Sequence, residues 1–135
     1  MQIHQLLAEY LGRRSAAPFD WANANCFHFA GNWVELVEGQ NPMAELPRWD
    51  SEVEALDLLN SMGGFDAAVT KTLAREPVAS SLAQLGDIVK LPLPGGRASM
   101  GICNGRTLIA IVESGAVVDL PMPQDSVAWR VGAAC

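Results

Sequence analysis

Apolar residues in the first part of the chain recur at helical spacing. In the opening segment they fall three or four positions apart, which predicts a short amphipathic helix over residues 1–14. A denser apolar run follows and predicts a largely buried helix within residues 19–39. Asn23 and Asn25 are suitable N-cap residues for it, and Gly39 is a suitable C-terminal stop. The first part of the chain is therefore expected to be helical.

Two further helices are predicted before the pattern changes. Apolar residues between Val53 and Met62 are again at helical spacing, and Gly63 and Gly64 end that segment. Residues 65–74 are compatible with another short helix.

From residue 85 onward the chain consists of short β-rich runs separated by proline and glycine. Asn104 and Gly105 stand between two of these runs and predict a β-hairpin. A last run over residues 127–131 is expected to close the sheet. The predicted fold class is α+β, with the helices first and an antiparallel sheet over residues 85–131. The predicted strands are residues 87–91, 99–103, 107–112, 115–120 and 127–131.

Length and composition limit the possible classes of protein. A chain of 135 residues with 50% hydrophobic and 18% charged residues corresponds to one folded domain, taken here as residues 1–135. The net charge of −6 argues against a nucleic-acid partner, because phosphate binding requires a basic face. The first residues do not resemble a secretory signal, and no apolar stretch is long enough to predict a membrane span.

Cys26 is the residue whose position suggests chemistry. A thiol in the first turn of a helix lies near unpaired backbone N–H groups and the positive end of the helix dipole, and both favour the thiolate. The same N–H groups can stabilise an oxyanion during acyl transfer. Free cysteine is also among the most frequently buried residues, so the position of Cys26 by itself favours a packing role over catalysis.

The order of several short motifs resembles a known family. Asp20 and Trp21, followed by Asn25 and Cys26 at the head of a helix, are similar to the start of NlpC-type, papain-like cysteine peptidase domains. The resemblance continues through Gly86-Asp87-Ile88-Val89, Met100-Gly101-Ile102-Cys103 and Ala128-Trp129-Arg130-Val131. It extends from about Leu6 to Val131 and is closest to small bacteriophage and prophage proteins with this fold.

The resemblance implies a fold, a site and a setting. The fold is a papain-like NlpC-type domain whose N-terminal helices pack on the C-terminal antiparallel sheet. Cys26 falls on the nucleophile that attacks cell-wall peptides, and Asp20, Trp21, Asn25 and His28 are candidate binding residues around it. The setting implied is the phage tail tip in the virion, reached after synthesis in the host cytoplasm, with other tail proteins as partners.

The catalytic base of the family has no counterpart in this chain. The family's histidine immediately precedes the hydrophobic-Gly-hydrophobic run, which places it at Ser99. A serine hydroxyl does not accept a proton near neutral pH as imidazole does. His28 is about 200° around the helix from Cys26, and His4 is on a different predicted helix. The favoured interpretation is a pseudoenzyme that serves as a structural or assembly protein; the alternative is an active cell-wall peptidase or amidase using Cys26.

Other chemistries are less well supported. Cys26 and His28 diverge around one helix and are two ligands where structural zinc needs four, so no metal site is predicted. The glycines do not form a phosphate-binding pattern, and no cofactor is expected. Asp20 and Asp87 are expected to be solvated or capping residues. Most of the aromatic residues are expected in the core, with one or two on a surface that meets another protein.

Overall fold

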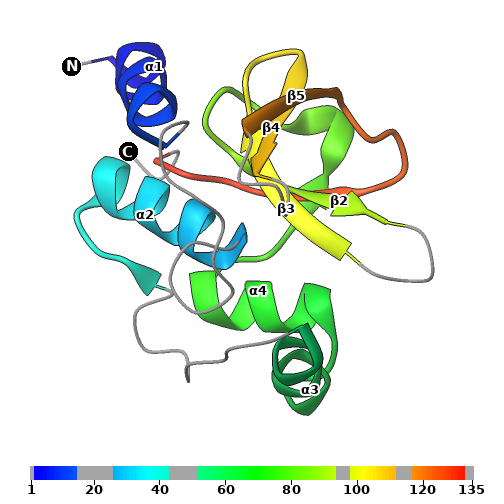
Figure 1. Ribbon diagram of the computed structural model, residues 1–135. Coiled ribbons are helices and arrows are strands. Elements are labelled where there is room, and N and C mark those ends of the chain that lie inside the picture. Colours follow the sequence, from blue (N-terminus) through cyan, green and yellow to red (C-terminus); the bar gives the residue numbers. More distant parts are fainter. Residues whose placement is uncertain (1, 15–25, 43–51, 94–97, 112–116, 133–135) are drawn as a thin grey trace.

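The computed structural model describes residues 2–14, 26–42, 52–93, 98–111 and 117–132. Within these ranges the protein is an α+β structure with helices against one face of an antiparallel sheet (Figure 1). The α-helices are α1 (Ile3–Arg14), α2 (Cys26–Glu38), α3 (Glu52–Ser61) and α4 (Phe65–Leu73). The strands are β1 (Val78–Ala79), β2 (Ile88–Pro92), β3 (Ala98–Cys103), β4 (Thr107–Ile111), β5 (Val117–Pro121) and β6 (Val127–Trp129), with a 3₁₀ turn, η2 (Ser80–Leu82), after β1.

The ends of the helices follow the local signals in the sequence. Gly39 follows α2 and has a φ of 91°, a conformation that favours glycine. Gly63 and Gly64 separate α3 from α4 with φ values of 97° and 104°. Ala74, which caps the C-terminus of α4, has a left-handed φ of 57° although it carries a Cβ. The predicted helices are thus confirmed within the described residues.

The sheet has the strand order β1-β6-β2-β3-β4-β5, and its described pairs are antiparallel. Strands β2 to β5 form the predicted meander, and the β3–β4 hairpin turns at Asn104-Gly105 as expected. The last strand, β6, pairs with β2 rather than with β5. It also pairs with the two-residue strand β1, so the sheet begins earlier in the chain than the predicted residue 85.

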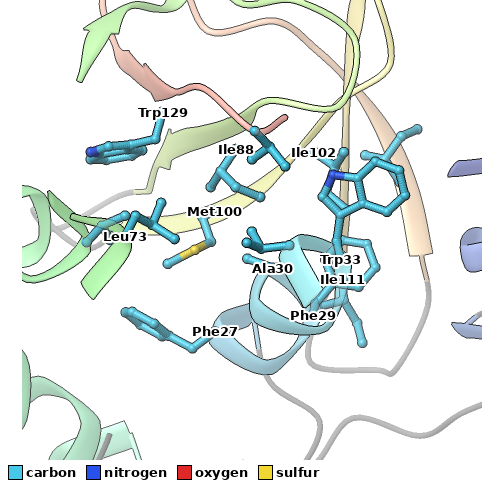
Figure 2. Close-up of a cluster of buried hydrophobic side chains, with 14 of the residues drawn as sticks. Phe27, Phe29, Ala30, Trp33, Leu73, Ile88, Met100, Ile102, Ile111 and Trp129 are labelled. Atoms are coloured by element: carbon cyan, nitrogen blue, oxygen red, sulfur yellow. The ribbon is translucent and has the colours of Figure 1, made fainter. Parts of the chain in front are cut away.

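The main core lies between α2 and the sheet (Figure 2). Ala30 and Trp33 of α2 meet Ile88, Met100 and Ile102 of the sheet, and all of them are fully buried. Successive side chains of a strand alternate between its two faces, so the strand residues next to these core residues point to the opposite face of the sheet. Four of them form a second buried cluster on that face, consisting of Val89, Cys103, Leu108 and Ala128.

Glycine at position 101 permits a close approach of two strands. A Cβ at Gly101 would clash with the backbone carbonyl of Ile109 and would lie 2.9 Å from Cδ1 of Leu108. Strand β4 therefore lies so close to β3 that there is no space for a side chain at position 101.

Candidate functional site

The candidate nucleophile begins the central helix. Cys26 is the first residue of α2, as the sequence predicts, and α2 packs against β3. The structure describes the backbone position of Cys26. Asp20, Trp21 and Asn25 lie outside the described residues.

Aromatic packing fixes the first turn of α2. Phe27 is 5% exposed, and its ring centroid lies 5.9 Å from that of Phe65 at the start of α4. It also lies against Ala55 and Leu58 of α3. The N-terminal end of α2 is therefore held by α3 and α4, which follow it in the chain.

Ser99 occupies the second position of β3. In the rest of the strand, the side chains of Met100 and Ile102 alternate in direction with Gly101 and Cys103. Met100 and Ile102 belong to the cluster that contains α2, whereas Cys103 belongs to the cluster on the other face. By the alternation of the strand, the half-buried Ser99 shares the face of Gly101 and Cys103. The residue at the expected base position is thus a hydroxyl on the face of β3 opposite to Met100.

The two histidines of the chain lie on different helices. His28 is half-buried and lies two positions after Cys26, about 200° around the helix axis. His4 is exposed on α1, which packs on α2 through Tyr10, whose ring centroid lies 5.5 Å from that of Phe29 and 5.7 Å from that of Trp33. Ile3, next to His4, approaches Gly86 close to the indole of Trp33. Trp33 is about 10 Å along α2 from Cys26, given the rise of a helix.

Asp87 is a buried residue that accepts two backbone hydrogen bonds. It is 1% exposed, and its carboxylate accepts from the backbone N–H groups of Gln84, at 2.9 Å, and Val131, at 3.1 Å. Burial raises the pKa of this carboxyl above its ordinary value of 3.8, although these two bonds act in the opposite direction. Asp87 is thus neither solvated nor a helix cap, the two expectations from the sequence, because it is buried and neither Gln84 nor Val131 begins a helix. It connects the turn before β2 to the chain after β6.

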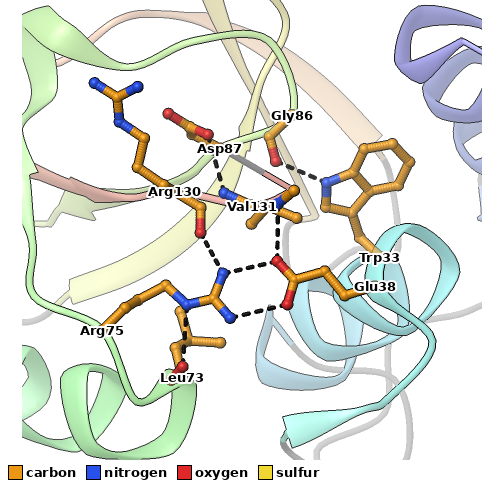
Figure 3. A network of polar contacts seen from close by, with 9 residues as sticks. Trp33, Glu38, Leu73, Arg75, Gly86, Asp87, Arg130 and Val131 are labelled. Carbon is orange, nitrogen blue, oxygen red and sulfur yellow. Dashed lines mark hydrogen bonds and ion pairs between the residues drawn. The ribbon is translucent and has the colours of Figure 1, made fainter. Parts of the chain in front are cut away.

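A second polar connection was not predicted from the sequence. Arg75 forms a bidentate ion pair with Glu38 and also donates to the backbone carbonyl of Arg130 (Figure 3). Glu38 accepts a further hydrogen bond from the N–H of Gly132 at 2.8 Å. Glu38 and Arg75 are 37 positions apart in the chain and carry no local pattern, so only the tertiary fold shows their relationship.

A groove opens between the helical part and the edge of the sheet. Its volume is about 490 Å³, and it lies between α3, the first turn of α4, and the ends of β2 and β3 that face them. Phe65 and Lys90 line it, and Nζ of Lys90 lies 5.9 Å from the ring centroid of Phe65. Lys90 also forms an ion pair with Asp66 at 2.7 Å. A volume of this size lies within the range of small-molecule binding pockets.

Among the described residues, metal-binding side chains do not gather at the start of α2 or in the groove. Among the residues that the structure describes, no three His, Cys, Asp or Glu side chains are placed to share a metal ion. No helix in the same residues is both long and apolar enough to cross a bilayer.

The fold and the candidate site define a class of protein: an α+β domain in which a helix beginning at a cysteine packs against an antiparallel sheet. Residues 1–131 match the domain of unknown function DUF6950, and the chain belongs to this family. A comparison with curated proteins found no match.

Proposed function

We propose that this protein is a structural or assembly component of a bacteriophage tail, at the tail tip, built on a degenerate papain-like peptidase domain. The resemblance to NlpC-type domains supplies the setting and places the nucleophile at Cys26. The arrangement of α2 on an antiparallel sheet is compatible with that fold.

The observation that carries the proposal is the distribution of possible proton acceptors. The position of the family's base is occupied by Ser99, and a thiol without an adjacent base is a weak nucleophile near neutral pH. His28 diverges from Cys26 around α2, and His4 follows Ile3, which lies close to Trp33. We therefore do not expect either imidazole of the chain to act as the base for Cys26.

A working cell-wall hydrolase is the alternative function. The observation in its favour is that α2 begins at Cys26, where the helix dipole lowers the pKa of a thiol. In that case the base would be an unconventional one or would come from a partner subunit.

Two measurements on purified protein separate these functions. We expect no release of products from peptidoglycan fragments, and we expect Cys26 to be alkylated slowly by iodoacetamide at about pH 6.5, because no adjacent base activates its thiol. The matched control is Cys26→Ala. It should show the same absence of peptidoglycan cleavage and the same melting temperature as the wild type. Cleavage by the wild type that Cys26→Ala abolishes would establish the hydrolase instead.

The structural role is tested in the phage or prophage that carries the gene. Deletion of the gene is expected to stop the formation of complete tails, and Cys26→Ala is expected to restore assembly as well as the wild-type gene does. Complete, infective tails in the deletion strain would contradict the proposed function.

A further inference from the structure

After strand β6 the chain is held by side chains from other parts of the fold. The described pairing of β6 ends at Trp129, which lies opposite Ile88 of β2. Residues 130–132 follow and are called here the post-β6 segment. In each of these three residues a backbone group is hydrogen-bonded to a side chain from another element (Figure 3). The segment is therefore attached differently from the strand before it.

One ion pair holds both ends of the post-β6 segment. Arg75 donates to the backbone carbonyl of Arg130, and Glu38 accepts from the backbone N–H of Gly132 at 2.8 Å. Glu38 and Arg75 are joined to each other by two hydrogen bonds of 2.7 and 2.9 Å. A change in either member of the pair therefore acts on both ends of the segment.

The middle of the segment has its own contacts. The backbone N–H of Val131 donates to the buried carboxylate of Asp87 at 3.1 Å, and the side chain of Val131 is 3% exposed within the main core. Next to it, Gly132 lies against α2, because a Cβ at this position would be 2.9 Å from Cγ1 of Val37. Release of the segment would therefore expose the apolar surfaces of Val131 and Val37 together.

We propose that residues 130–132 form a latch that opens as one unit while the sheet stays paired, and that the Glu38–Arg75 pair sets how often it opens. Segments held by a few partly exposed contacts open at a lower free energy than the core of a domain. The two side chains of the pair are 30% and 26% exposed, whereas Met100 and Ile102 of β3 are fully buried. Opening gives the protein a second, more apolar surface at the end of α2. This conformational change goes beyond the proposed function and does not depend on it.

Hydrogen–deuterium exchange of the full chain, followed by NMR, tests whether the latch opens separately from the sheet. We expect the amides of Val131 and Gly132 to exchange at least about tenfold faster than the amides that pair β2 with β3, after correction for intrinsic rates. Urea below the unfolding transition should leave the two latch amides unchanged, because their opening exposes little surface. The same urea should accelerate the amides of the sheet.

Glu38→Gln tests whether the latch opens as a unit. Gly132 is bonded to Glu38, but Val131 is bonded to Asp87. We nevertheless expect both amides to exchange faster by the same factor, about tenfold, because the loss of one charge-assisted contact makes opening of the whole segment easier. Arg75→Lys is a second variant that keeps the charge and loses the bidentate geometry, so it should accelerate both amides by a smaller factor.

Asp66→Asn is the matched control. It removes an ion pair of the same length, 2.7 Å between Nζ of Lys90 and Oδ1 of Asp66, at a place remote from residues 130–132 in the chain. We expect the exchange of the two latch amides in this variant to equal that of the wild type.

Three results would overturn the latch. Exchange of Val131 and Gly132 at the rate of the β2–β3 amides would show that the segment opens only when the protein unfolds. Acceleration of Gly132 alone in Glu38→Gln would show that its three residues do not move together. Equal acceleration by Asp66→Asn and Glu38→Gln would show that the Glu38–Arg75 pair does not control the opening.

Discussion

Arg75 binds both carboxylate oxygens of Glu38: Nη1 lies 2.7 Å from Oε2, and Nη2 lies 2.9 Å from Oε1. The pair joins the end of α2 to the residue that follows the cap of α4. Because Arg75 also donates to the carbonyl of Arg130 and Glu38 accepts from the N–H of Gly132, the same pair holds the chain beyond β6. Two side chains thereby connect three parts of the chain.

Replacement of Arg75 by methionine is expected to lower the free energy of unfolding by about 1–2 kcal/mol, because Arg130 and Glu38 each lose a charge-assisted partner. Partial exposure of the pair, 30% and 26% for the two side chains, limits the effect. A double-mutant cycle with Glu38→Gln, followed by urea unfolding, is expected to give a coupling energy of about 1 kcal/mol. Additive effects of the two substitutions would show that the pair contributes nothing by itself.

Glu38 and Asp87 are expected to influence acid stability in opposite directions. The hydrogen bond from Arg75 lowers the pKa of Glu38 from 4.5, so its contribution is present above that value and is lost as the pH falls through the lower pKa of the folded state. Burial raises the pKa of Asp87 from 3.8, so the folded state binds its proton more tightly. The contribution of Asp87 therefore declines as the pH rises from 3.8 through the raised pKa.

Urea unfolding at a series of pH values between about 3 and 7 measures both contributions. Relative to the wild type, Glu38→Gln should remove part of the loss of stability on acidification. Asp87→Asn should make that loss steeper, while lowering stability overall because an amide cannot accept both backbone hydrogen bonds. Identical pH profiles for the wild type and both variants would contradict the assigned shifts.

The sequence was sufficient for the parts of the fold that have local causes. Helical spacing, the glycines at 39, 63 and 64, and the Asn104-Gly105 turn each act within a few residues, and the structure follows them. The position of β6 beside β2 was not accessible, because strand order depends on contacts between distant segments. The two-residue strand β1 is too short to carry a periodic pattern.

The candidate site was predictable to the same extent. Spacing placed Cys26 at the start of a helix and separated it from His28, and both positions follow from the rise and turn of α2. The groove was not predictable, since Leu56, Phe65 and Lys90 come from elements that meet only in the folded chain.

Two reciprocal substitutions are expected to stabilise the protein. Gly12→Ala places a methyl group in α1 where no atom of the described residues lies within 4 Å of it, so the gain in helix propensity should be about 0.5–1 kcal/mol. Ala74→Gly removes a Cβ from a left-handed residue and should also contribute about 0.5–1 kcal/mol. Melting curves test both, and a decrease in melting temperature for either variant would show that its backbone or surroundings differ from those described.

Gly101→Ala is expected to be strongly destabilising, by about 3 kcal/mol or more, because the new methyl group would meet the backbone carbonyl of Ile109. Gly12→Ala is the matched control, since it makes the same chemical change where there is space. Wild-type stability for Gly101→Ala would mean that β3 and β4 are farther apart than the structure places them. Should the variant fail to accumulate, Ala74→Gly is introduced into the same chain as a second, stabilising substitution, and a partial recovery would show that the defect of Gly101→Ala is one of stability.

Cys103 is expected not to react with thiol reagents in the native protein. It is fully buried beside Leu108, and burial raises the pKa of its thiol, so both access and thiolate formation are suppressed. The other two cysteines of the chain, Cys26 and Cys135, are replaced by serine for this test. In that double variant the reaction with Ellman's reagent at about pH 8 should proceed only through unfolding and should accelerate as urea is added. A fast phase in the absence of urea would place Cys103 at the surface. Because only Cys103 can react in this double variant, its rate can be subtracted from that of the Cys135→Ser protein. The difference is the reaction rate of Cys26. This rate is the quantity on which the choice between assembly protein and hydrolase depends.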